Sequence, residues 1–243
     1  MIEISSYTDV GRVRDKNEDS HDVISLSNST YLCMVADGVG GSAGGEVASQ
    51  LALETVSSYL QTAKEDFPVE CRKYLLEAIK RANQEIYEQG RADPTLYNMA
   101  TTLTALVCQG HDVWLGHVGD SRGYLVRKNS MEQITKDHSL VEELVRHKKI
   151  TPEEAKIHPY RNMLTKALGF ESSVAPETYQ LQVKPGDIIL LCTDGLTNMV
   201  PEDEICQGLE NQEFNEVAKM LTEKALSYGG VDNITAVALK WVK

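Results

Sequence analysis

The chain lacks most features that would set it apart from an ordinary globular protein. It has no low-complexity tract and no internal repeat of fixed period. Its longest apolar runs, such as Ile188 to Cys192, are far shorter than the roughly 20 residues of a membrane-spanning helix. The N-terminus MIEISSYTDV lacks the pattern of a signal peptide. These absences predict a soluble, cytoplasmic protein with a single domain over residues 1–243 and no membrane partner.

Positive charge is also scarce. The 24 Lys and Arg residues face 36 Asp and Glu residues, which leaves a net charge of −12. Binding to nucleic acid or to anionic lipid requires a basic face. The composition therefore excludes nucleic acid as a partner and implies that no substrate is held by bulk charge.

The cysteines lack the spacing of a metal or redox site. There is no Cys-x-x-Cys pair, and no histidine stands at the spacing of a zinc site. We expect all five to be reduced, structural residues in a reducing compartment. They are Cys33, Cys71, Cys108, Cys192 and Cys206.

Apolar residues at three-and-four spacing predict several helices. The clearest run from Glu46 to Ala63 and from Val69 to about Gln89. Thr151-Pro152-Glu153-Glu154 has the cap, the proline and the capping-box glutamate of a helix start. Further helices are expected at 137–146, 201–209 and 214–228.

Strands are expected in groups, and this grouping favours an antiparallel α+β fold over alternating βαβ units. Segments 101–110, 111–119 and 122–128 have the spacing of a meander. Two later strands are separated by the turn Pro185-Gly186. The expected strands outside the meander are 22–26, 31–35, 178–183, 187–192 and 233–242.

The segment YLCMVADGVGGSAGGE, Tyr31 to Glu46, raises the first functional question. An apolar run stops at Asp37 and is followed by five glycines. Asp-Gly between apolar residues is a strong hairpin signal. Glycine also lets a ligand approach the backbone closely, so the same stretch fits a binding site.

Three further aspartates lie beside a glycine or a turn at the end of a strand. Each one alone is an ordinary turn former. If the strands are neighbours in one sheet layer, the carboxylates converge on one acidic pocket and repel one another. A divalent cation offsets that repulsion, and ligands that are all oxygens favour Mg²⁺ or Mn²⁺ over zinc or copper. The four aspartates are Asp37, Asp120, Asp194 and Asp232, and the Gly38 carbonyl is a further candidate ligand.

Near the N-terminus, Arg14 stands close to Glu18 and Asp19. A surface salt bridge is the ordinary explanation of such a segment. The planar guanidinium of arginine also binds phosphate through paired hydrogen bonds. Beside a two-metal cluster, this residue favours phosphoryl chemistry.

The chain resembles a known family at this point, the metal-dependent serine/threonine protein phosphatases of the PP2C (PPM) type in their compact bacterial form. The matching motifs occur in the family's order over nearly the whole chain. They are RDKNED (14–19), VADGVGG (35–41), TTLTAL (101–106), HVGDSR (117–122), DHS (137–139), ITPEEAKIHPYRNMLTKALG (150–169), LLCTDGL (190–196) and DNIT (232–235).

The resemblance implies a four-layer αββα sandwich, in which two antiparallel sheets are flanked by helix pairs. It also implies a flap beside the active site at about 148–168, and a role for each candidate site residue. Asp37 and the Gly38 carbonyl bridge two ions of Mn²⁺ or Mg²⁺, with Asp194 and Asp232 completing one shell. Glu18 and Asp19 hold metal-bound waters, Asp120 with Asp194 binds a third ion, Asn233 supports the ligands, and Arg14 binds the substrate phosphate.

The implied reaction is direct attack of a metal-bridging hydroxide on phosphoserine or phosphothreonine. The absence of a Cys-x5-Arg loop agrees with a mechanism that forms no phosphoenzyme. The implied partners are phosphorylated proteins, namely a cognate Ser/Thr kinase and its targets. The implied oligomeric state is a monomer.

One departure from the family pattern concerns proton donation to the leaving group. Bacterial relatives commonly have a histidine where this chain has Ser42, and serine is a poor acid at neutral pH. His21 is an alternative general acid, although a lone histidine is as often a packed structural residue, and a metal-bound water is a third candidate. We expect slower turnover of substrates with poor leaving groups.

Two other functions are compatible with parts of this pattern. A catalytically weak or inactive family member could act as a regulatory phosphoprotein-binding partner, but loss of a metal aspartate would be its mark, and Asp37, Asp194 and Asp232 are all present. A structural calcium-binding domain predicts a contiguous acidic loop. The acids here are spread along the chain instead.

Overall fold

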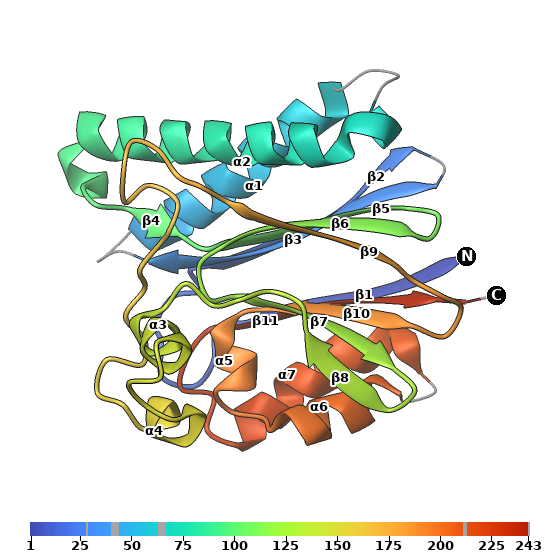
Figure 1. Ribbon diagram of the computed structural model, residues 1–243. Coiled ribbons are helices and arrows are strands. Elements are labelled where there is room, and N and C mark those ends of the chain that lie inside the picture. The colour runs from blue at the N-terminus through green and yellow to red at the C-terminus, as the bar shows by residue number, and fades with distance from the viewer. Residues whose placement is uncertain (28, 40–43, 63–66, 211–212, 243) are drawn as a thin grey trace.

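The computed structural model describes residues 1–243 except 28, 40–43, 63–66, 211–212 and 243. Two antiparallel sheets pack face to face, and helices cover the outer face of each (Figure 1). The predicted α+β class and its four layers are confirmed. Both termini lie at the same end of the sandwich, and the short helices α3, α4 and α5 lie toward the other end (Figure 1).

The first sheet has the strand order β2-β3-β5-β6-β9, and β4 pairs with the end of β3. Its two central strands are buried almost throughout, because helices cover one face and the second sheet covers the other. This explains their nearly continuous apolar sequences. The strands are β2 (Asp19–Ser27), β3 (Thr30–Val39), β4 (Ala100–Thr101), β5 (Leu103–Gln109), β6 (Asp112–Val118) and β9 (Glu177–Gln182).

The second sheet has the order β1-β11-β10-β7-β8. In the interior of this sheet, β10 and β11 pair in antiparallel orientation. The strands are β1 (Ile2–Asp9), β7 (Arg122–Arg127), β8 (Ser130–Gln133), β10 (Ile188–Cys192) and β11 (Ile234–Trp241).

Each sheet has its own helical cover. Helices α1 (Gly44–Thr62) and α2 (Phe67–Ala92) lie on the first sheet, and α6 (Glu202–Leu209) and α7 (Val217–Ser227) lie on the second (Figure 1). Three apolar clusters fill the two helix–sheet layers and the space between the sheets. The short helices are α3 (Leu140–Arg146), α4 (Pro152–Lys156) and α5 (Asp194–Thr197), with 3-10 turns at Pro94–Leu96 and Phe214–Glu216.

The predicted meander is wrong in its third strand. β5 and β6 form a hairpin, but β7 crosses to the other sheet and pairs with β10. The Pro185-Gly186 turn likewise connects β9 of the first sheet to β10 of the second. Local turn signals do not specify which sheet a strand joins, because that choice depends on the packing of both faces.

Local helix signals were more reliable. The capping box of Thr151 is formed, with Glu154 donating its backbone N–H to the threonine and accepting from it. The helix expected at 137–146 begins only at Leu140, because Ser139 serves as its N-cap. Strand β8 was not predicted, since its polar sequence SMEQ lies at a sheet edge, where its residues alternate between exposed and half-buried.

The cysteines agree with their predicted role. All five are buried and free of disulfide bonds. In the described part of the chain, no helix is long and apolar enough to cross a membrane.

Candidate active site

The stretch around Asp37 is not a hairpin turn. Strand β3 continues through Asp37 and Gly38 to Val39, so that Asp37 faces Asp19 on β2 and Gly38 pairs with Thr101 on β4. Two threonines fix this backbone. The Asp37 N–H donates to Thr102 Oγ1 at 2.8 Å, and the Asp37 carbonyl accepts from Thr101 Oγ1 at 2.9 Å. The hairpin alternative is therefore wrong.

The glycines near Asp37 allow segments of the chain to approach one another. A Cβ atom added at Gly38 would lie 2.2 Å from the Gly45 carbonyl oxygen, and one added at Gly45 would lie 2.9 Å from Glu18 Oε1. Residues with side chains would separate β3, the first turn of α1 and Glu18. The glycines thus bring the Glu18 carboxylate next to the strand that carries Asp37.

The candidate aspartates come from both sheets, so the expectation of a single sheet layer is wrong. Asp37 lies in β3 and Asp120 follows the end of β6, and these two strands belong to the first sheet. Asp194 follows β10 and Asp232 precedes β11, both in the second. The four meet at one end of the sandwich because the facing sheets place these strand ends opposite one another.

The electrostatics show that these carboxylates share one buried region. Burial raises the pKa of Asp37 well above its ordinary value, and the charges of Asp19, Asp194, Asp120 and Asp232 raise it further. The pKa values of Asp120 and Asp194 are raised for the same reasons, with burial first and a neighbouring carboxylate next. The protein alone therefore disfavours the charged form of several neighbouring carboxylates.

Asp19 is the carboxylate most restrained by neutral donors. Its Oδ2 accepts from Thr193 Oγ1 at 2.8 Å and from Thr235 Oγ1 at 2.7 Å, while burial raises its pKa to about 7. Its Oδ1 is buried and has no hydrogen-bond partner among the described residues. A buried carboxylate oxygen without a partner is costly, so it marks a position where a water or a cation belongs.

Two other carboxylates are held by side chains of the protein. Asp232 Oδ2 accepts from Arg14 Nη2 at 2.9 Å, and the Arg14 side chain is half exposed. Asp194 Oδ2 accepts from Asn198 Nδ2, one turn along α5, at 2.9 Å. Arg14 therefore lies at the solvent side of the acidic group, where an incoming anion would meet it.

Asn233 joins the N-terminal loop to the last strand. Its Oδ1 accepts from the Glu18 N–H at 2.8 Å, and its Nδ2 donates to the carbonyl oxygens of Val10 and Lys16 at 2.8 and 2.9 Å. All of these bonds are to backbone. Asn233 thus positions Glu18 beside Asp232 and uses its own side chain fully in doing so.

The residues present fit a divalent oxygen-ligand ion, by their donor type and by the partnerless Oδ1 of Asp19. The side chains are not already arranged as ligands. Within residues 1–27, 29–39, 44–62, 67–210 and 213–242, no three His, Cys, Asp or Glu side chains surround one point in metal-binding geometry. Instead, Asp232 accepts a hydrogen bond from Arg14 and Asp194 accepts one from Asn198. The two carboxylates would have to rotate away from these donors to bind an ion.

The two candidate proton donors are placed differently. His21 lies on β2 opposite Val35, two residues from Asp19 and therefore on the same face of the strand. Burial lowers its pKa, which disfavours the protonated form that an acid catalyst needs. Ser42 lies outside the described residues.

Sequence reasoning missed a buried ion pair beside the acidic group. Arg122 donates through Nε and Nη2 to the Asp137 carboxylate, at 2.9 and 2.7 Å to Oδ2, and donates through Nη1 to the Tyr124 hydroxyl. The signal was present in the motifs HVGDSR and DHS, which contain both partners. Arg122 follows Asp120 by two residues, and its charge opposes the rise in the pKa of Asp120.

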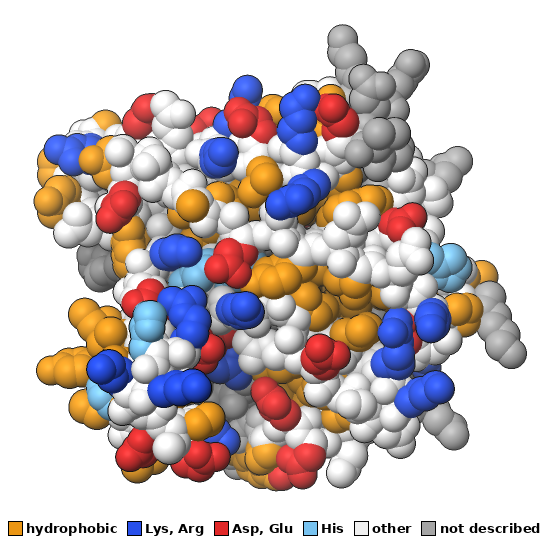
Figure 2. Space-filling view, viewed as in Figure 1, with side chains coloured by type: hydrophobic (Ala, Val, Ile, Leu, Met, Phe, Trp, Pro, Cys, Tyr) orange, Lys and Arg blue, Asp and Glu red, His pale blue; other side chains and the backbone are white. Residues whose placement is uncertain are grey.

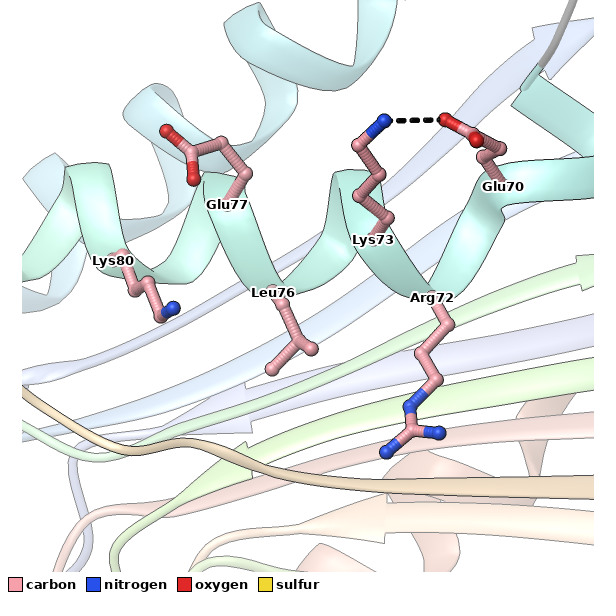
Figure 3. A pocket seen from close by; sticks show the side chains of 6 residues that line it. All are labelled: Glu70, Arg72, Lys73, Leu76, Glu77 and Lys80. Carbon is pink, nitrogen blue, oxygen red and sulfur yellow. Dashed lines mark hydrogen bonds and ion pairs between the residues drawn. The ribbon is translucent and has the colours of Figure 1, made fainter.

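A separate depression of about 430 Å³ lies on α2, away from the acidic group. Figure 3 shows its lining side chains, which all project from this one helix, and the Lys73–Glu70 ion pair of 2.7 Å. Alternating charges on a solvent-exposed helix offer no convergent chemistry. The depression is a feature of the helix surface and not a second site.

Comparison with known proteins agrees with this geometry. The protein phosphatase 2C family model matches residues 12–230. The chain is 40% identical over 235 residues to the serine/threonine phosphatase stp of Listeria innocua, covering 96% of this chain and 93% of the relative. The structure of the S. agalactiae serine/threonine phosphatase is 33% identical with a TM-score of 0.94, covering 100% of both chains.

A further solved structure is the catalytic domain of the serine/threonine protein phosphatase PstP in complex with two manganese ions. It is 38% identical, with a TM-score of 0.85 over 100% of this chain and 99% of that one. The chain belongs to the protein phosphatase 2C family. It is an enzyme of that class, a serine/threonine protein phosphatase of the compact bacterial form.

Proposed function

We propose that the acidic end of the sandwich is the active site of a metal-dependent phosphatase for phosphoserine and phosphothreonine in proteins. The observation that carries the proposal is the group of half-buried carboxylates with raised pKa values, next to the buried Oδ1 atom of Asp19 that lacks a partner. A bound cation would favour the charged form of these carboxylates and offset their mutual repulsion. The relative with two bound manganese ions supports two ions of Mn²⁺, and oxygen ligands also suit Mg²⁺.

In this proposal each acidic residue has a place around the ions. Asp37, the Gly38 carbonyl, Asp194 and Asp232 would hold two ions, and Asp120 with Asp194 would hold a third. Glu18 and Asp19 act through water, since Asp19 is already bound by Thr193 and Thr235. When bound, the cations supply a water of lowered pKa and neutralise the phosphate oxygens.

The substrate phosphate is assigned to Arg14. Its side chain is about 53% exposed and already binds the carboxylate of Asp232, which is a planar anion of similar hydrogen-bonding geometry. Exchange of that carboxylate for a phosphate would orient the substrate over the acidic group. Residues of about 148–168 form the flap that borders this position, and the natural substrates are phosphorylated proteins.

The test is hydrolysis of a phosphothreonine peptide with Mn²⁺, with Mg²⁺ and with EDTA, by the wild type and by Asp194→Asn. We expect activity that requires the ion and falls at least 100-fold in the variant, because one of the groups that stabilises charge in the transition state is lost. A folded wild type that is inactive with every ion would instead favour the regulatory phosphoprotein-binding alternative.

A further inference from the structure

Residues 146–166, here called the basic segment, overlap the proposed flap at about 148–168. They differ in charge from the rest of the molecule. In a chain of net charge −12, they contain six of the 24 Lys and Arg residues but only two of the 36 acids. The cations are Arg146, Lys148, Lys149, Lys156, Arg161 and Lys166, and the acids are Glu153 and Glu154. The basic segment is therefore a positive region on a negative protein.

Four of these cations are not engaged by the protein itself. Lys148, Lys149, Lys156 and Arg161 are exposed. None of the four forms an ion pair with any residue of the described chain. By contrast, Lys73, Arg81, Lys219 and Lys224 on the outer helices each have a carboxylate within 4.0 Å. The positive charge of the basic segment is thus available to a partner.

The same segment exposes large apolar side chains. Ile157 is 81% exposed, Tyr160 59% and Met163 55%. Figure 2 shows hydrophobic side chains protruding beside Lys, Arg and His side chains on the side of the molecule where α3 and α4 lie. Apolar side chains gathered within a charged rim are typical of a protein interaction surface.

Backbone pairing attaches the basic segment to the candidate active site. Leu168, just beyond it, pairs with Thr101, whose hydroxyl donates to the Asp37 carbonyl at 2.9 Å. Within it, the Thr165 N–H donates to the His138 carbonyl at 2.8 Å. The C-terminal end of the basic segment is therefore anchored beside the strand that carries Asp37.

We propose that the basic segment binds acidic and apolar residues that flank the phosphorylated residue of the protein substrate. This inference rests on the function proposed above and names its substrate class. Because the remainder of the enzyme is acidic, it repels acidic polypeptides, and the exposed cations offset this repulsion only near the active site. The enzyme accordingly prefers phosphosites in acidic sequences, and it selects them through KM.

The test compares two phosphothreonine peptides that share one hydrophobic residue pattern and differ only in acidic or neutral flanks. The substrate p-nitrophenyl phosphate, which is too small to reach the basic segment, reports on the active site alone. The variant is Lys149→Gln with Lys156→Gln. The matched control is Lys80→Gln with Lys219→Gln, which removes the same charge from α2 and α7.

We expect the wild type to hydrolyse the acidic peptide about three- to tenfold better in kcat/KM, since exposed charge pairs each contribute modestly. The difference should shrink in 1 M salt, where the screening length is about 3 Å. The basic-segment variant should lose it and the control should keep it, with equal p-nitrophenyl phosphate activity. Equal preference in variant and control, or no preference in the wild type, would overturn the proposal.

Binding of both peptides is measured in parallel by fluorescence anisotropy in EDTA, so that the inference is tested without turnover. If no substrate is hydrolysed with any ion while the acidic peptide still binds preferentially, the proposed function fails and the docking inference stands. If concentration-dependent sedimentation shows that the cations instead hold the acidic face of a second copy, the docking inference is overturned.

Discussion

Strand β10 is flanked by one aspartate before its start and one after its end, and the two have different surroundings. The carboxylate of Asp187, just before the strand, accepts hydrogen bonds from Arg127 Nε at 2.9 Å and from the Lys184 N–H at 2.6 Å. Burial acts to raise its pKa, but these hydrogen bonds outweigh burial and leave the pKa lowered. Asp194, just after the strand, lies among other carboxylates, and burial together with Asp232 raises its pKa.

The difference separates a structural carboxylate from a functional one. At the Asp187 end the chain supplies its own cation, so the charge is balanced within the fold. At the Asp194 end the protein supplies threonine, asparagine, the half-exposed Arg14, and Arg122, whose guanidinium is already paired with Asp137. These groups together leave the pKa values of Asp194 and Asp120 raised. Burial alone therefore does not identify a site, whereas burial without an internal counter-charge does.

Paired substitutions at the two ends should give opposite results. Asp37→Asn should lower kcat/KM for a phosphothreonine peptide about 1000-fold, because it removes a group proposed to hold both ions. Its metal-free stability should be unchanged or higher, since like-charge repulsion is relieved. Denaturant unfolding in EDTA and peptide hydrolysis with Mn²⁺ give the two readouts.

At the other end, Asp187→Asn should lower the free energy of unfolding by about 2 kcal/mol, because Arg127 loses its charged partner. The folded variant should keep its kcat/KM. If Asp187→Asn lost activity without losing stability, or Asp37→Asn lost stability without losing activity, the distinction between the two ends would be wrong.

Manganese should stabilise the folded protein by binding at the acidic end, and not at the Asp187 end. At 100 times its dissociation constant, an ion that binds the native state alone adds about 2.7 kcal/mol. For a chain of this size that corresponds to a rise in Tm of roughly 5–10 °C. The rise should be present in Asp187→Asn and absent in Asp37→Asn, as measured by calorimetry, and an equal rise in both variants would contradict the assignment.

Arg14 should matter for activity much more than for stability. Arg14→Ala should lower kcat/KM by about 10- to 100-fold, in line with the loss of hydrogen bonds to a charged group. Arg14→Lys should recover only part of this, because an ammonium cannot make the paired bonds of a guanidinium. Since its bond to Asp232 is an exposed ion pair, the unfolding free energy should change by less than about 1 kcal/mol, and full activity in Arg14→Ala would exclude the phosphate role.

A further test is the pH dependence of metal-free stability. Asp19 has a folded pKa of about 7 against about 3.9 when unfolded, so the folded state binds more protons between these values and stability falls as pH rises from 4 to 7. Asp187, with a lowered folded pKa, contributes stability above pH 4 that is lost as pH falls further. Asp19→Asn should flatten the decline between pH 4 and 7 in EDTA, and an unchanged slope would contradict the pKa.

Several features could be predicted from the sequence because they depend on neighbours along the chain. The capping box of Thr151 and the long helices follow from spacing within a few residues. The α+β class follows from the grouping of elements. Strand β8 and the late start of α3 could not be predicted in the same way, since an edge position and a cap are decided by contacts with other segments.

The candidate site was predicted in composition but not in arrangement. The aspartates beside glycines were visible in the sequence, whereas their division between two facing sheets was not. The roles of Thr193 and Thr235 could not be predicted either. Their hydroxyls donate hydrogen bonds to Asp19, which is 174 and 216 residues away in the sequence. Hydrogen bonds of that range depend on the packing of whole sheets, which no local pattern encodes.

By itself the sequence determined the type of chemistry, because oxygen ligands, an arginine and the lack of a reactive cysteine motif are properties of composition and order. Only the tertiary structure decided which carboxylates are balanced and which are not. A pKa depends on burial and on charges a few ångströms away, and at this site those charges come from strands at opposite ends of the chain. The functional difference between Asp187 and Asp194 therefore exists only in the folded protein.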